Sequence, residues 1–129
     1  MDPRAAADAY RSSSIENAPP IKIVRLLYQG ALRFLDQAAR EDPSDPTSGF
    51  LNLIGRADAI ITELRLAIDH SVAAPEVTQN LERLYLYCED ELGKVSVERS
   101  AERLPAVREV LATLLDAWQH VEVEGQTTP

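Results

Sequence analysis

Apolar residues recur every three or four positions in four separate stretches of the chain. This spacing places the apolar side chains on one face of an α-helix, because successive residues are rotated by about 100° around the helix axis. Short connections rich in Pro, Ser and Asp separate the four stretches. We therefore predict four amphipathic helices, whose apolar seams are Val24, Leu27, Ala31, Phe34, Leu35 and Ala38; Phe50, Leu53, Ala57, Ile60, Ile61, Leu64 and Ile68; Val77, Leu81, Leu84, Cys88, Leu92 and Val95; and Leu104, Val107, Leu111, Leu114, Trp118 and Val121.

Prolines and turn-forming residues set the expected ends of these helices. Pro19 and Pro20 precede the first helix and Pro75 opens the third, at positions that tolerate a missing backbone N–H. Pro105 follows a natural cap, Ser100, so it could either occupy the first turn of the fourth helix or kink it. We expect helices over residues 20–40, 46–71 and 75–97, and a fourth that ends near residue 122.

The chain is expected to form a single domain with short extensions at both ends. Four helices of similar length joined by short connections must lie antiparallel to their neighbours. The predicted fold is therefore all-α, an antiparallel up-down-up-down four-helix bundle over residues 19–122. Residues 1–18 are polar and rich in small residues, so we expect a mobile N-terminal arm or a short extra helix there. Residues 123–129 are expected to be a disordered tail.

The charge balance and the cysteine content narrow the functional classes. The chain has 13 basic and 21 acidic residues, a net charge of −8, and its basic residues are scattered, which disfavours nucleic acid as a partner. No stretch is long and apolar enough for membrane insertion, and the N-terminus lacks the apolar core of a signal peptide. Cys88 is the only cysteine, so an internal disulfide and a thiolate metal cluster are excluded. We expect a cytoplasmic protein.

The sequence offers no visible catalytic or metal-binding constellation. A di-iron bundle needs Glu three residues before His, but Ala67 and Ala117 stand there before His70 and His120. A phosphotransfer bundle needs an exposed histidine beside a lysine, and solvated histidines at helix ends are the favoured interpretation. The carboxylates of the acidic stretch 88–92 point in different directions around a helix, which favours a solvated face over a cation site. We therefore expect no enzyme activity, no metal and no cofactor.

Several apolar residues lie outside the four seams. Leu66 and Leu86 fall nearly opposite the seams of their helices, and Ile23, Leu26 and Gly30 form a flank of the first helix. The glycine leaves room there for a side chain or backbone of a partner. Alternatively, the leucines are ordinary exposed residues and Gly30 only allows close approach of the second helix. Recognition of an amphipathic helix in a groove and a homodimer interface are both compatible with this second apolar surface.

Four sequence blocks occur in the order typical of one protein family. The first is AYRSSSIENAPPIKIVRLLYQGALRFLDQA, with a tyrosine, a polar spacer, an Ala-Pro-Pro step and a Leu-Tyr-x-Gly-Ala helix. ADAIITELRLAID, LERLYLYCEDEL and VREVLATLLDAWQHV follow. Together they cover about residues 10–122 and resemble the flagellar secretion chaperones of the FliS family. The chain departs from the family pattern at GKVSV, where Ala-Asn is frequent, and at Pro105, both near the connection of the third and fourth helices.

The resemblance implies a cytoplasmic, non-enzymatic export chaperone. Such a protein binds the disordered C-terminal segment of flagellin, prevents premature filament polymerisation and assists delivery to FlhA at the flagellar type III export gate. A helical adaptor that forms a weak homodimer is the alternative from the residues alone, and a phosphotransfer-type bundle is a more distant one.

Candidate site residues follow from the apolar surface and the resemblance together. One flagellin-binding groove is expected at Ile23, Leu26, Tyr28 and Gly30, and outer grooves at Leu66, Leu86 and Tyr87. By resemblance, the N-terminal arm with Tyr10 and Ile15 acts as a lid hinged at Pro19, and Tyr10 also belongs to the region that contacts the export gate. For Tyr28 the alternative is an aromatic at the edge of the core with its hydroxyl at the surface.

Overall fold

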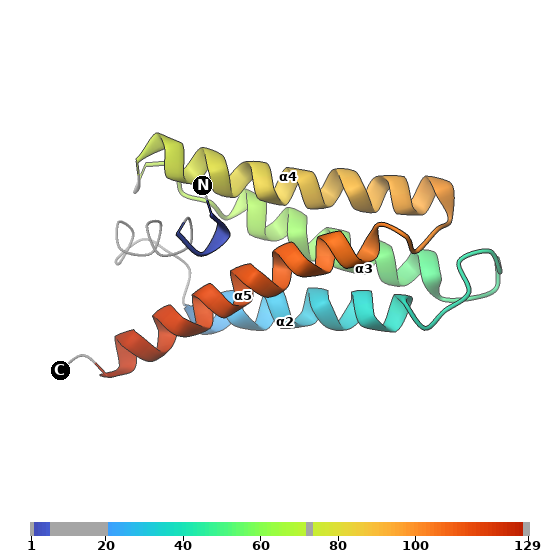
Figure 1. Cartoon of the computed structure of the whole chain (residues 1–129), viewed down its shortest axis with the longest axis horizontal. Coiled ribbons are helices and arrows are strands. Elements are labelled where there is room, and N and C mark those ends of the chain that lie inside the picture. The colour runs from blue at the N-terminus through green and yellow to red at the C-terminus, as the bar shows by residue number, and fades with distance from the viewer. Residues whose placement is uncertain (1, 6–20, 72–73, 128–129) are drawn as a thin grey trace.

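The computed structural model describes residues 2–5, 21–71 and 74–127 of the chain (Figure 1). Its long helices are α2 (Ile21–Ala38), α3 (Phe50–Leu66), α4 (Pro75–Glu98) and α5 (Leu104–Thr127), and residues 3–5 form a single helical turn. α2 packs against α3 and α5, and α4 packs against the same two helices. The predicted all-α four-helix bundle is therefore confirmed, with neighbouring helices running in opposite directions (Figure 1).

Aliphatic side chains from all four helices form the core. On α5, Val107, Leu111 and Leu114 are completely buried on the predicted seam. Full burial of such a side chain stabilises the fold by about 1.5–3 kcal/mol. Thr78 is the one polar residue that is buried among the residues described, and its hydroxyl donates a hydrogen bond to the carbonyl of Pro75 at 3.2 Å. The core therefore needs few polar contacts to be satisfied.

The buried seam of α2 is rotated relative to the predicted one. Val24, Tyr28 and Leu35 are buried, whereas Leu27 and Phe34 are only partly buried at the edge of the core. Both sets of residues have helical spacing, so the pattern alone permits either seam. The rotation turns Leu27 and Phe34 toward the side of α2 that faces α3.

α3 is shorter than predicted because the loops at both ends form their own turns. It begins at residue 50 instead of 46 and ends at residue 66 instead of 71. Before the helix, the carboxylate of Asp45 accepts a hydrogen bond from the backbone N–H of Thr47 at 2.8 Å. After it, Asp69 accepts one from the N–H of Ser71 at 3.0 Å. Such side-chain contacts compete with helical hydrogen bonds and hold these residues in turns.

α5 is longer than predicted. Pro105 is its second residue, in the first turn, which decides between the two positions considered for it. Residues 123–127, which we expected to belong to a disordered tail, continue the helix to Thr127. No proline interrupts this stretch, and one glycine is not enough to end a helix. Residues 128–129 lie outside the described part of the chain.

Arg99 holds the backbone turn that ends α4. Its dihedral angles of φ 50° and ψ 54° place it in the left-handed region, and its N–H donates to the carbonyl of Val95. Glycine is the usual residue at this position, because a Cβ atom makes the left-handed conformation costly. The α4–α5 connection is therefore locally strained.

An Arg99→Gly variant should be more stable than the unmodified protein by about 0.5–1 kcal/mol in free energy of unfolding. Urea denaturation measures this as a higher midpoint with an unchanged slope. Arg83→Gly, in the exposed middle of α4, is the matched control and should be less stable by about 1 kcal/mol. An Arg99→Gly midpoint as low as that of the control would contradict the assigned turn.

Candidate functional site

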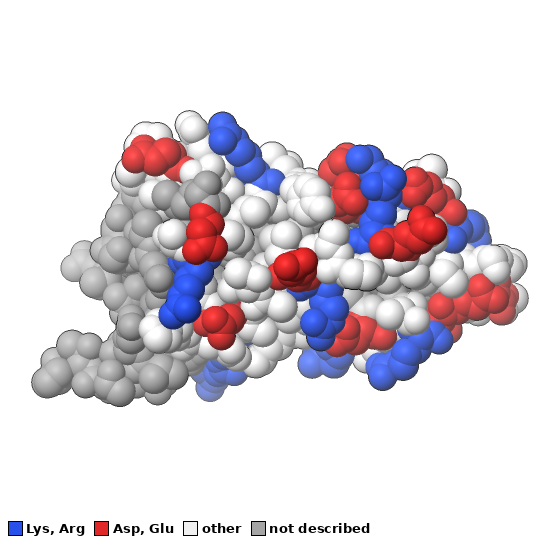
Figure 2. Space-filling view, viewed as in Figure 1, with Lys and Arg blue, Asp and Glu red and all other residues white. Residues whose placement is uncertain are grey.

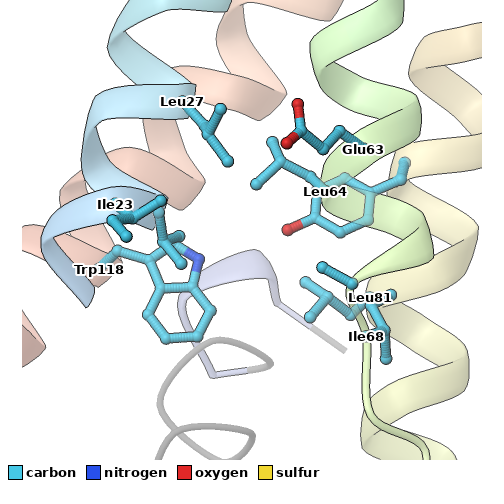
Figure 3. A pocket seen from close by; sticks show the side chains of 10 residues that line it. Ile23, Leu27, Glu63, Leu64, Ile68, Leu81 and Trp118 are labelled. Atoms are coloured by element: carbon cyan, nitrogen blue, oxygen red, sulfur yellow. The ribbon is translucent and has the colours of Figure 1, made fainter. Parts of the chain in front are cut away.

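A cavity of about 150 Å³ opens where α2, α3, α4 and α5 meet near the start of α2 (Figure 3). Its walls are apolar or aromatic apart from Glu63, and include Ile23 and Leu27 from α2, Leu64 from α3, Ile68 from the turn after α3, Leu81 from α4 and Trp118 from α5. A cavity of this volume in an apolar site holds a group about the size of benzene. It can therefore accept one large apolar side chain from a partner.

A buried group of aromatic side chains lies directly behind the cavity. The hydroxyls of Tyr28 and Tyr85 are hydrogen-bonded to each other, and the two ring centroids are 6.4 Å apart. Burial raises the pKa of Tyr28, and hydrogen bonds with Tyr85 and Trp118 only partly oppose this rise. Tyr85 and Trp118 also line the cavity, so they join it to the core. Tyr28 is therefore neutral at physiological pH, and both tyrosines act as packing residues.

Tyr28 does not line a surface groove, which corrects the prediction for this residue. Its side chain is completely buried, and its hydroxyl points into the protein and not to the surface. Tyr85 also belongs to the core. Local spacing gives no sign of the hydroxyl pair, because the two tyrosines are 57 residues apart in sequence.

An exposed apolar strip continues from the cavity along the joint between α2 and α3. Ile23 and Leu26 are each 51% exposed, although both are large and apolar. Gly30 follows one turn later and is buried beside α3: a Cβ atom added to it would lie 3.4 Å from Cδ1 of Ile60. The glycine therefore permits close approach of the two helices, as the alternative interpretation held. We call Ile23, Leu26, Gly30, Ile60 and Glu63 the α2–α3 face.

The other candidate residues are placed elsewhere or lie outside the described part of the chain. Leu66, Leu86 and Tyr87 are exposed on α3 and α4, with Leu66 the most accessible of the three at 72%. None of them lines the cavity. The lid residues predicted at positions 10, 15 and 19 (Tyr10, Ile15 and Pro19) are not among the residues that the structure describes.

Sequence reasoning missed the cavity because its walls come from four different helices. Leu64, Leu81 and Trp118 were assigned only to helical seams, and these residues do border the core. Their positions along the chain could have indicated that these residues meet, because in an antiparallel bundle each of them lies near the same end. The separation of helices that leaves a cavity between them is not encoded in any one seam.

Several charged side chains of the bundle form ion pairs between helices or within one helix. Glu89 on α4 accepts hydrogen bonds from Thr62 and from Nε of Arg65 on α3, the latter at 2.6 Å. Burial alone would raise the pKa of Glu89, but these hydrogen bonds outweigh it and hold the pKa below its usual value. Asp36 on α2 pairs with Arg108 on α5 at 2.7 Å. Acidic and basic groups alternate over the face shown in Figure 2.

The remaining candidates for chemistry have ordinary structural environments. In the acidic stretch of α4, Asp90 pairs with Lys94 at 3.1 Å, and Glu91 pairs with Arg103 at 3.2 Å and with Lys94 at 3.6 Å, so basic side chains of the protein already neutralise these carboxylates. Burial, followed by the nearby carboxylates, raises the pKa of Cys88 to about 12, which leaves its thiol protonated. Among the described residues, no three His, Cys, Asp or Glu side chains are arranged to hold a metal ion. None of the helices searched there is long and apolar enough to cross a bilayer.

The family model and the three curated relatives reported below all describe the same kind of protein. A family model described as "Flagellar protein FliS" matches residues 3–125, which include all of α2, α3 and α4 and most of α5. "Flagellar secretion chaperone FliSB" of Pseudomonas aeruginosa is 34% identical over 122 residues, covering 90% of this chain and 94% of the relative. "Flagellar secretion chaperone FliS" of Campylobacter jejuni is 28% identical, covering 94% of each chain. The Bacillus subtilis protein of the same description is 24% identical, covering 86% of this chain and 81% of the relative.

Proposed function

Because this chain belongs to the FliS family of flagellar secretion chaperones, we propose that its client is flagellin, whose C-terminal segment it binds in the cytoplasm before export. The family is non-enzymatic, so the protein acts by binding. Holding the segment prevents flagellin from polymerising before it leaves the cell. Delivery of the complex to FlhA at the export gate completes the proposed role.

The cavity and the exposed strip beside it are the observation that carries this proposal. Ile23 and Leu26 are half exposed next to a cavity that takes one apolar side chain. An amphipathic helix binds such a surface by placing one anchor side chain in the cavity and others along the strip. A disordered segment can gain this helical structure on binding, because burial of its apolar face offsets the entropy lost.

Further contacts are proposed on the remaining candidate residues. Leu66 and Leu86 supply apolar area on the outer sides of α3 and α4, and Tyr87 adds an amphipathic ring suited to an interface. A long client segment can continue from the α2–α3 face onto these helices. By family resemblance, the arm with Tyr10 and Ile15 covers the binding surface until flagellin arrives, and Tyr10 contributes to the contact with FlhA.

Titration of the protein with the C-terminal segment of flagellin from the same source tests the proposal. We expect a dissociation constant in the micromolar range or below, measured by calorimetry, and slower amide exchange in α2 and α3 on binding. A scrambled segment of the same composition is the control and should bind far more weakly. Absence of binding at micromolar concentration would exclude flagellin as the client.

A weak homodimer through the same exposed leucines is the competing explanation of this surface. It predicts that the sedimentation coefficient rises with protein concentration and that a Leu26→Glu or Leu86→Glu variant removes this rise. The client proposal predicts a monomer under the conditions of the titration, or a dimer that flagellin dissociates.

A further inference from the structure

Two arginines converge at the end of the α2–α3 face that is remote from the cavity. Arg33 on α2 and Arg56 on α3 both lie over the ring of Phe34, with their Cζ atoms 6.0 and 5.7 Å from the ring centroid. Neither belongs to an ion pair among the described residues, whereas Arg65, Arg103 and Arg108 do. In a chain with 21 acidic residues, two unpaired guanidinium groups on one aromatic ring leave local positive charge.

The opposite end of the face carries a carboxylate. Glu63 lies at the wall of the cavity, is exposed, and has no ion-pair partner among the residues described (Figure 3). Arg56, Ile60 and Glu63 are spaced by four and three residues along α3, so they follow one side of the helix. Along α3, the α2–α3 face therefore has a carboxylate beside the cavity and a guanidinium group at Phe34, with an apolar side chain between them.

This polarity complements the dipole of an α-helix. A helix carries partial positive charge at its N-terminus and partial negative charge at its C-terminus, and a terminal carboxylate adds a full negative charge. Guanidinium groups bind carboxylates through charge-assisted hydrogen bonds, often two at a time. A helix on this face is favoured with its N-terminal part near Glu63 and its C-terminus at the two arginines.

We propose that Arg33 and Arg56 bind the α-carboxylate of flagellin and thereby fix the direction of its C-terminal helix. This inference rests on the proposed function, since it assigns the end of the same client. The helix runs parallel to α2, with an apolar anchor in the cavity and its last residue at Phe34. Ile23 and Arg33 are separated by ten residues of α2, about 15 Å at the helical rise, so the anchor lies about ten residues before the end of flagellin.

The test compares two forms of the flagellin C-terminal peptide, one with a free terminal carboxylate and one with a terminal amide. With the unmodified full-length chaperone, amidation should weaken binding by about three- to tenfold, and less at high salt. With an Arg33→Gln/Arg56→Gln variant, the two peptides should bind equally. Arg83→Gln, which removes an exposed arginine from α4, is the matched control and should retain the full effect of amidation.

Two results would overturn the inference. One is an amidation effect of the same size in the double variant and in the unmodified protein. The other is no amidation effect at all, with both peptides weakened by the double variant, which would assign the arginines to an acidic side chain of the client. If neither peptide binds the unmodified chaperone, the proposed function itself fails, and this outcome is distinct from both.

Direction can be measured independently with a nitroxide placed three residues before the peptide's C-terminus. The label should broaden the backbone amide signals around Arg33 and Arg56 more strongly than those around Ala67, which lies beside the cavity. Stronger broadening at Ala67 than at the two arginines would show the opposite direction and exclude the proposal.

Discussion

A Tyr28→Ala variant is expected to lose about 3–5 kcal/mol of its free energy of unfolding, a large share of the stability of a domain of this size. Tyr28 is completely buried between the cavity and the centre of the bundle. Its removal leaves a void that rigid helices can only partly close, and it also leaves the hydroxyl of Tyr85 without this partner. Urea denaturation followed by circular dichroism measures the loss.

Tyr87→Ala is the matched control for this experiment. Tyr87 is 41% exposed on α4, so its truncation should change the free energy of unfolding by less than about 1 kcal/mol. Equal effects of the two substitutions would mean that Tyr28 is not packed in the core as described.

The hydroxyl pair can be separated from the packing of the rings. Tyr28→Phe should cost about 1–2 kcal/mol, because it removes one hydroxyl and leaves the hydroxyl of Tyr85 without that buried partner. Adding Tyr85→Phe should cost less than its own single substitution, since the orphaned group is then removed as well. An additive double variant would show that the two hydroxyls do not depend on each other.

Tyr28 also shows which feature of the fold the apolar periodicity does not determine, namely which side of α2 is buried. Helix number, order and most core positions follow from apolar spacing, because that spacing is a local property of each helix. On α2, however, a seam through Leu27 and Phe34 and a seam through Tyr28 and Leu35 have the same spacing. Which of the two seams is buried depends on whether the hydroxyl of Tyr28 finds a hydrogen-bond partner in the core. Tyr85, supplied by another helix, satisfies it here.

For the candidate site too, some features could be predicted from the sequence and others could not. The exposure of Leu26 was predictable, because it falls outside either possible seam of α2, whereas Ile23 lies one turn before Leu27 on the same side of the helix. The cavity beside them was not predictable, since its volume depends on how far four helices stand apart at one end of the bundle. The charge polarity of the face was also hidden, because it requires α2 and α3 to bring Arg33 and Arg56 onto one ring.

An Ile23→Glu/Leu26→Glu variant should weaken binding of the flagellin C-terminal segment by at least about a hundredfold. Each side chain contributes about 1.5–3 kcal/mol if an apolar partner covers it fully, and a carboxylate in its place must also lose water to be covered. Two such losses exceed the roughly 2.7 kcal/mol that corresponds to a hundredfold change. Calorimetric titration against the same peptide measures the effect.

The variant is designed to leave the fold unchanged, which makes its binding result interpretable. Both positions are half exposed, and a glutamate at position 23 lies in the first turn of α2, where negative charge favours the helix dipole. Val97→Glu is the control: it replaces an apolar residue that is 85% exposed on α4 and should alter binding less than threefold, by about 0.7 kcal/mol at most. If the double variant keeps its helix content and still binds within threefold of the unmodified protein, flagellin does not use the α2–α3 face. The arginine assignment would then fail with it, and the exposed residues Leu66 and Leu86 would become the next surface to test.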